Sequence, residues 1–192
     1  MIHKKYTWLI VVAVILLLVV GGLSWYVGQR NALIALEESV NGAWSEVDNQ
    51  LQRRSDLIPN LVSTVRGFAA QEQQVFSDIA EARSRLAGAQ SVSETAESYQ
   101  QMESALSRLL VVVEAYPELR SNQNFIRLQD ELAGTENRIA VARQRYNNSV
   151  QNFNARIRMF PASLFAGGLG LTQRDYFEID QQARSVPQVN FD

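Results

Sequence analysis

The chain has 192 residues, of which 46% are hydrophobic and 20% are charged. It contains no cysteine, which excludes disulfides, thiolate metal sites and thiol nucleophiles, and its single histidine, His3, excludes multi-histidine metal sites. The net charge of −2 combines +3 in residues 1–30 with −5 in the remaining residues, and an acidic domain is not typical of a nucleic-acid binder.

An apolar segment near the N-terminus predicts a membrane-spanning helix. No charged residue occurs in the range Tyr6–Gln29, which provides about 20 apolar positions, enough to cross a bilayer core of about 30 Å. Trp8 lies near one end of the segment, and Trp25 and Tyr26 lie near the other, as in the aromatic belts at the two membrane interfaces. We therefore predict that residues 1–30 form a single-pass anchor and that the lipid bilayer is a partner through this helix.

A cleaved signal peptide is the alternative, because Lys4 and Lys5 precede the apolar run. The run is longer than the apolar core of a signal peptide and no A-x-A-like cleavage site follows it, which favours the uncleaved anchor. Two lysines precede the span, and only Arg30 follows it closely. By the positive-inside rule, this difference in positive charge favours an N-terminus in the cytoplasm and a domain outside it.

Beyond the anchor, the apolar pattern predicts long amphipathic helices. Apolar and small residues recur at alternating steps of three and four from position 33 to position 86, and Arg54 and Glu72 interrupt this stripe. Neither Gly nor Pro breaks the pattern just after Gly28, which allows one continuous helix through the anchor and the first soluble helix.

Pro59 lies within the stripe, where it removes a helix hydrogen bond and clashes with the preceding turn. We therefore expect a kink or break near Asp56–Ile58. Asp56 would then be the N-cap of a new helix that starts at Leu57, with Pro59 in its first turn.

The turn residues in the range Gly88–Glu94 predict the end of that helix, and Ser93 or Thr95 is expected to cap the next one, over about 95–116. Tyr116-Pro117 ends it, because the residue before proline is pushed out of helical conformation. Its expected apolar face consists of Leu106, Leu109, Leu110 and Val113.

Asn122 or Asn124 is then expected to cap a long helix that reaches about Met159, with Pro161 closing it. A short helix is expected over 172–184, and the last residues, SVPQVNFD, look extended. The apolar stripe of the long helix consists of Phe125, Leu128, Leu132, Ile139, Ala142, Tyr146, Val150, Phe153, Ile157 and Phe160.

These elements predict an all-α fold: an N-terminal transmembrane helix followed by an antiparallel helical bundle with long helices. Short alternating runs typical of strands are missing from the sequence. The expected divisions are the anchor at 1–30, the bundle at 31–160, and a hydrophobic Gly-containing loop, short helix and extended tail at 161–192.

Polar residues that interrupt apolar stripes suggest a shared network between helices. Its candidate members are Asp48, Arg53, Arg54, Asp56, Glu136, Arg143, Asn147 and Asn154. The favoured interpretation is a buried network of ion pairs and amides that fixes helix register. The alternative is a site for a small polar ligand or a carboxylate-bound metal, but arginines compete for each carboxylate, so we expect no metal and no cofactor.

The stretch from Met159 to Gln173 is uncharged and apolar. It either folds back onto the bundle or forms a contact with another subunit, a partner or the bilayer. It lacks a basic face of its own, which favours protein over lipid. The candidate contact residues are Leu164, Phe165, Leu169 and Leu171.

Several longer motifs carry a family resemblance. They are Trp44-Ser45-Glu46-Val47-Asp48, the segment QLQRRSDLIPNLV at 50–62, Ala115-Tyr116-Pro117-Glu118-Leu119, Leu128-Gln129-Asp130-Glu131-Leu132 and Thr135-Glu136-Asn137-Arg138-Ile139. With these motifs the chain resembles the LemA proteins over essentially its whole length. The resemblance implies an antiparallel helical bundle behind an N-terminal anchor in the bacterial inner membrane. It implies no established enzymatic activity, and a magnetosome-forming relative suggests work in organising or remodelling membranes.

The sequence therefore favours a membrane-anchored, non-enzymatic scaffold that self-associates and organises or remodels the bacterial membrane. The alternative is an adaptor that binds another membrane protein, such as a protease or a sensor. An enzyme is disfavoured, because serine nucleophiles lack a histidine partner and the only lysines are Lys4 and Lys5. It would need a polar pocket that holds Asp48, Arg143 and Asn147. Nucleic acid is not an expected partner.

Overall fold

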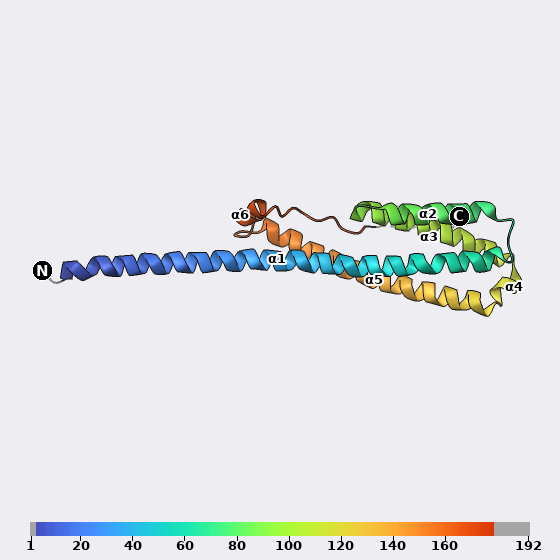
Figure 1. Cartoon of the computed structure of the whole chain (residues 1–192), viewed down its shortest axis with the longest axis horizontal. Helices are drawn as coiled ribbons and strands as arrows, with labels where there is room; N and C mark the ends of the chain where they lie inside the picture. Colours follow the sequence, from blue (N-terminus) through green and yellow to red (C-terminus); the bar gives the residue numbers. More distant parts are fainter. Residues whose placement is uncertain (1–2, 179–192) are drawn as a thin grey trace, which may run out of the picture. The chain divides into compact units, whose positions relative to one another are not determined.

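The computed structural model describes residues 3–178, and Figure 1 shows its elements in chain order. No strand occurs in this described part, and the predicted all-α fold is confirmed. The elements are α1 (His3–Arg66), α2 (Gln73–Gly88), α3 (Val92–Glu114), α4 (Pro117–Arg120), α5 (Gln123–Arg158), α6 (Ser163–Ala166) and the 3₁₀ helix η1 (Gly167–Leu169).

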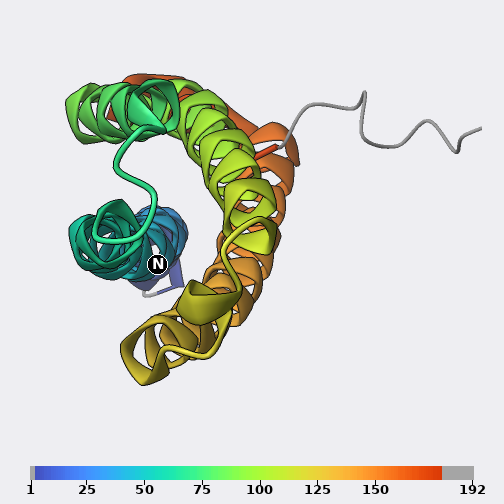
Figure 2. The same ribbon diagram turned by 90° about the vertical axis from the view of Figure 1, so that its right-hand side faces the viewer.

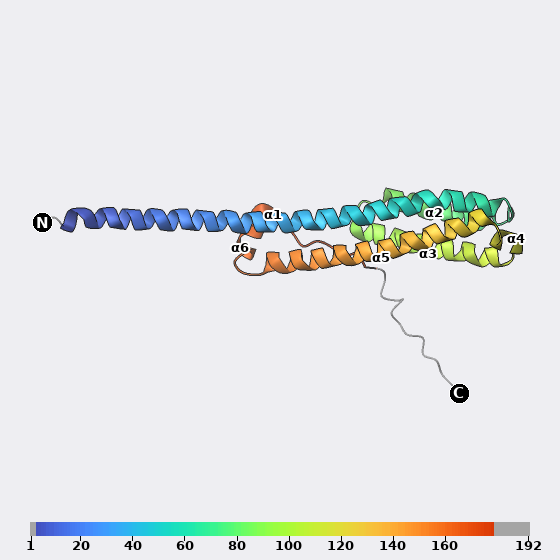
Figure 3. The same ribbon diagram turned by 90° about the horizontal axis from the view of Figure 1, so that it is seen from below.

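Helix α1 contains the apolar segment and continues beyond it to Arg66, and Figures 1 and 3 both show it unbroken. By length and composition it is able to cross a membrane. Its most apolar 18-residue window has a mean hydropathy of 2.6, and none of that window is buried in the protein. A long apolar surface that the chain itself does not cover is typical of a segment in contact with lipid.

The predicted helix break near Asp56–Ile58 is wrong, because α1 continues through Pro59. Asp56 is not a helix cap, and its carboxylate instead accepts a hydrogen bond of 2.9 Å from Gln52 Nε2. Ile58 and Leu61 are both buried on the core side, while Pro59 is exposed. Burial of neighbouring apolar side chains therefore offsets the hydrogen bond that proline removes.

The turn that separates α1 from α2 lies instead at residues 67–72, and it begins with Gly67 directly after the last helical residue, Arg66. At the start of α3 the cap is Ser91, not Ser93 or Thr95: Ser91 Oγ accepts from the Glu94 backbone N–H at 3.2 Å. Glu94 in turn accepts from the backbone N–H of Gln90 at 2.8 Å, so the two side chains act together as in a capping box.

The start of α5 agrees with the prediction from the sequence. Asn122 is confirmed as the cap of α5, since its Oδ1 accepts from the backbone N–H groups of Asn124 and Phe125. Leu110 and Phe160, however, are exposed and lie outside the buried stripes to which they were assigned. The helix expected over 172–184 is wrong for residues 172–178, which are extended, and its remainder and the tail SVPQVNFD lie outside the described residues.

The chain divides into two compact units. Unit 1 contains residues 1–41 and 149–174, and unit 2 contains residues 42–148 and 175–192. The expected division into 1–30, 31–160 and 161–192 stays a prediction. Within unit 1 the buried apolar residues include Leu33, Val40, Val150, Phe153, Ile157, Ala162 and Ala166.

Unit 2 holds the larger apolar core, to which α1, α2, α3, α4 and α5 all contribute. Figure 2 looks along these helices and shows α2 beside α3. The spacing of three and four along each helix places one face in this core, as in a helical bundle. Its buried members include Ile58, Leu61, Val65, Phe76, Ile79, Met102, Leu106, Leu109, Val113, Leu119, Phe125 and Leu132.

Candidate functional site

The most concentrated polar chemistry in unit 2 is a group that we call the Arg54 cluster: Arg54, Tyr99, Glu103 and Glu136. Arg54 lies between Leu51 and Ile58 on the buried stripe of α1, so its guanidinium enters the bundle. Its Nη2 donates to Glu103 Oε1 at 2.6 Å, and its Nη1 donates to the Leu132 carbonyl at 2.7 Å and lies 3.3 Å from Glu136 Oε2.

Tyr99 completes this cluster by donating its hydroxyl hydrogen to the Glu136 carboxylate. Arg54 thus joins α1 to both α3 and α5, and Tyr99 joins α3 directly to α5. Charge-assisted hydrogen bonds of this kind have strict distance and angle requirements, so they specify how the helices align.

Burial governs the protonation of this cluster. Desolvation raises the pKa of Glu103 above its ordinary value of 4.5, and the nearby Arg54 opposes this shift while Glu136 adds to it. Burial, followed by the charge of Glu103 and the hydrogen bond to Glu136, raises the pKa of Tyr99 far above its ordinary range. The tyrosine is therefore a permanent hydrogen-bond donor at physiological pH, and it is not available as a base.

The raised pKa of Glu103 predicts a pH dependence of stability. The folded protein holds this proton more tightly than the unfolded chain, so the free energy of unfolding falls as the pH rises from 4.5 through the raised pKa. Glu103→Gln removes the titrating group and is expected to flatten this fall, measured as urea midpoints of the full chain in mild detergent. Glu97→Gln changes an exposed carboxylate on the same helix and is expected to retain the wild-type slope. Equal slopes for both variants would contradict the assignment.

A second feature of unit 2 is an aromatic cluster around Phe177. Its ring lies 6.1 Å from the Trp44 ring and 6.3 Å from the Tyr99 ring, and the Arg143 guanidinium lies over it at 4.9 Å. Asn147 fixes the backbone of Phe177 by accepting from its N–H at 2.9 Å and donating to its carbonyl at 3.1 Å. Burial lowers the pKa of Arg143, and the charges of Tyr99 and Glu136 oppose this shift. The Nε of Arg143 is buried without a hydrogen-bond partner, and the aromatic face of Phe177 adds a stabilising contact to the guanidinium.

Asn154 has the same chemistry within unit 1. Its Oδ1 accepts from the Arg174 backbone N–H and its Nδ2 donates to the Arg174 carbonyl, both at 2.8 Å. The Arg174 side chain also bonds Glu37 at 2.7 Å. Backbone N–H and C=O groups outside a helix or sheet need other hydrogen-bond partners. The Asn154 amide supplies both of these partners for Arg174.

Asn154→Ala is therefore expected to destabilise the protein by about 1–3 kcal/mol, because it leaves both backbone groups of Arg174 without their partner. The measurement is urea unfolding of the full chain in mild detergent, followed by circular dichroism. Asn152→Ala is the matched control: this asparagine is exposed, two residues away on the same helix, and its replacement is expected to change stability by less than about 0.5 kcal/mol. Similar losses for both variants would mean that the amide pairing contributes nothing.

The structure brings some candidate residues into contact and not others. Arg54 and Glu136 meet, Arg143 and Asn147 both contact Phe177, and Asn154 contacts Arg174. Three candidates, Asp48, Arg53 and Asp56, are exposed and lie outside the buried contacts. The sequence interpretation also missed Tyr99, Glu103 and Phe177, although the first two lie at helical spacing on the buried side of α3.

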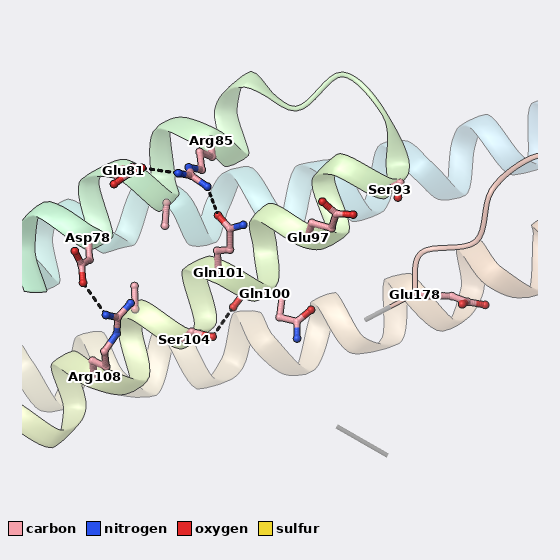
Figure 4. A pocket seen from close by; sticks show the side chains of 12 residues that line it. Asp78, Glu81, Arg85, Ser93, Glu97, Gln100, Gln101, Ser104, Arg108 and Glu178 are labelled. Atoms are coloured by element: carbon pink, nitrogen blue, oxygen red, sulfur yellow. Dashed lines mark hydrogen bonds and ion pairs between the residues drawn. The ribbon is translucent and has the colours of Figure 1, made fainter. Parts of the chain in front are cut away.

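A polar groove of about 860 Å³ lies along α2 and α3 in unit 2 (Figure 4). Arg108 of α3 bonds Asp78 of α2 at 2.7 Å, and Arg85 of α2 bonds Gln101 of α3 at 3.2 Å and Glu81 at 2.6 Å. These contacts link the walls of the groove to each other. Among the residues that the structure describes, no three His, Cys, Asp or Glu side chains gather as metal ligands.

The candidate contact residues of the uncharged stretch have different surroundings in unit 1. Phe165 packs edge-on against the rings of Trp25 at 5.8 Å and Tyr26 at 5.1 Å, and Leu171 is buried. Leu169 is half-buried, whereas Leu164 is exposed. Part of the stretch therefore packs against α1 through Phe165, and another part presents apolar surface at Leu164.

Comparison with known proteins gives a consistent relationship. The model of the LemA family matches residues 43–191. Magnetosome protein MamQ 2 of Paramagnetospirillum magneticum is 25% identical, with 83% of this chain and 68% of the relative covered. Magnetosome protein MamQ of Magnetospirillum gryphiswaldense is 24% identical, covering 94% of this chain and 75% of the relative. Protein LemA of Metamycoplasma hominis is 25% identical, covering 87% of this chain and 75% of the relative.

Proposed function

This chain belongs to the LemA family, and from that premise we propose that it is a membrane-anchored, non-enzymatic scaffold that self-associates and organises or remodels the bacterial membrane. The observation that carries the proposal is α1. Its apolar window is uncovered by the rest of the protein, and the same helix continues into the residues that form the core of unit 2. Anchoring and bundle formation thus share one element. We further propose the inner membrane as the location, with the bundle outside the cytoplasm.

A structural role for the polar residues supports the non-enzymatic part of this proposal. Both carboxylates of the cluster, Glu103 and Glu136, are paired with Arg54, and Tyr99 donates to Glu136, so the cluster offers no free base beside a free nucleophile. The enzyme hypothesis needs Asp48 in one pocket with Arg143 and Asn147, yet Asp48 is exposed. Two of the similar proteins are named magnetosome proteins, which supports a part in organising a cell structure rather than in catalysis for this chain as well.

Exposed apolar residues on α3 support self-association. Leu110 and Val111 are adjacent, and both are solvent-exposed in unit 2. Single exposed apolar residues are common on protein surfaces, but adjacent ones form a continuous apolar area that another copy of the chain could cover. We place the contact between copies at this part of α3, in addition to any contact between anchors within the bilayer.

Light scattering after size-exclusion chromatography of the full chain in mild detergent tests this proposal. We expect an assembly of several copies that Val111→Asp reduces in mass. Gln144→Asp adds the same charge at an exposed polar position of α5 and is expected to leave the mass unchanged. A monomer at every concentration would contradict the scaffold. If crosslinking in native membranes then captured one different membrane protein per chain, the adaptor alternative would replace it.

A further inference from the structure

Helix α6 lies level with the end of the apolar segment of α1 in unit 1. The segment Trp8–Val27 has the length of a bilayer core, about 20 residues, so Trp25 and Tyr26 lie where the span meets the headgroups. Phe165 of α6 contacts both of these rings, at 5.8 Å and 5.1 Å. A direct contact of this kind places α6 at the same depth as the interfacial aromatics.

Beside Phe165, three large apolar side chains are left uncovered. Phe160 is 79% exposed, Leu164 is 68% exposed and Met159 is 57% exposed. Met159 and Phe160 lie in the turn that follows α5, and Leu164 lies in α6. Their neighbours Ala162 and Ala166 face inward and are buried, so the segment is amphipathic rather than unfolded.

Arginines that the fold brings to this place supply the charge that the uncharged stretch lacks in its own sequence. Arg156 donates to Gln29 Oε1 at 2.8 Å, which places its guanidinium beside the end of the span. Arg30 and Arg158 are exposed on the two neighbouring helices. On this side of the span, unit 1 has four Arg against two Glu, a balance that attracts anionic headgroups.

We infer that the segment Met159–Ala166 is a second membrane contact, which inserts Met159, Phe160 and Leu164 into the headgroup interface beside the emerging anchor. Arg30, Arg156 and Arg158 then meet lipid phosphates, which guanidinium groups bind well. The apolar surface at Leu164 belongs to lipid in this arrangement and not to another copy of the chain. The inference rests on the proposed function in one respect, which is that α1 spans the bilayer.

The absence of cysteine makes the inference testable by single labels. Leu164→Cys and, as a second position, Phe160→Cys are labelled with an environment-sensitive fluorophore in the full chain. The labelled chains are placed in vesicles of phosphatidylethanolamine and phosphatidylglycerol, and the control is Val141→Cys, an exposed apolar position in unit 2. The vesicles contain lipid with a nitroxide near the headgroup end of the acyl chain. Insertion by about 5–10 Å is expected to make quenching at Leu164 and Phe160 at least about twofold greater than at Val141.

Three results would overturn the inference, and they are distinguishable. Quenching at Leu164 and Phe160 that does not exceed quenching at Val141 would place the segment outside the lipid while leaving the anchor intact. Labels shielded from both nitroxide lipid and aqueous iodide would assign the surface to a contact between proteins. Flotation of the vesicles after a carbonate wash tests the anchor itself, and release of the protein there would contradict the proposed function and remove the basis of the inference.

Discussion

Arg54→Ala is expected to lower the free energy of unfolding by about 3 kcal/mol. The guanidinium is buried and contacts Glu103, Glu136 and the Leu132 carbonyl, so its removal leaves two negative charges close together without their cation. Loss of one partner from a buried ion pair costs about 3–5 kcal/mol. The lower end applies here because the Glu103 and Glu136 side chains are 34% and 40% exposed and keep part of their hydration.

The neighbouring Arg53 provides the matched control for this prediction. It is exposed on the same turn of α1, so Arg53→Ala removes the same charge from the sequence and is expected to change stability by less than about 0.5 kcal/mol. Arg54→Lys keeps the positive charge but lacks the planar guanidinium, which reaches three acceptors at once. This variant is expected to lose less stability than Arg54→Ala. Chemical unfolding of the full chain in mild detergent measures all three variants. Equal losses at Arg53 and Arg54 would show that net charge, not the cluster, sets the effect.

Local signals in the sequence were sufficient for some helix boundaries and misleading for others. The cap at Asn122 and the end of α3 before Pro117 depend on side chains within a few residues, and both are confirmed. Pro59 is also a local signal, but its cost is offset by burial of Ile58 and Leu61 against residues far away in sequence, such as Met102. The break falls instead at Gly67, where the apolar spacing of the sequence continues through positions 65 and 68.

The polar contacts show a similar limit. A charged residue on an apolar stripe predicted that Arg54 enters the bundle, but the pattern on α1 alone does not identify Glu103 and Tyr99 as its neighbours on α3. Asp48 follows the buried Val47 by one residue, and one helical residue turns the side chain by about 100°, which directs Asp48 to solvent. For Asn147 the partner is the backbone of an extended segment that the sequence interpretation had assigned to a helix.

Phe177→Ala is expected to destabilise unit 2 by about 3–5 kcal/mol. The side chain is 1% exposed, and its ring contacts Trp44, Tyr99 and Arg143. Alanine removes buried apolar area and leaves a cavity among rings that are fixed by helices, so little relaxation can fill it. It also removes the aromatic face below Arg143, whose Nε has no hydrogen-bond partner to compensate.

Tyr176 gives the comparison that isolates this effect, because it is the adjacent aromatic residue in the same extended segment and is partly exposed. Tyr176→Ala is expected to cost less than about 1 kcal/mol. Phe177→Leu keeps most of the apolar volume but not the face over Arg143, and it is expected to fall between the two alanine variants. Thermal unfolding of the full chain in mild detergent ranks the three. If Phe177→Ala and Tyr176→Ala have the same midpoint, the returning C-terminal segment does not stabilise the bundle, and the contacts of Asn147 with that segment are without energetic consequence.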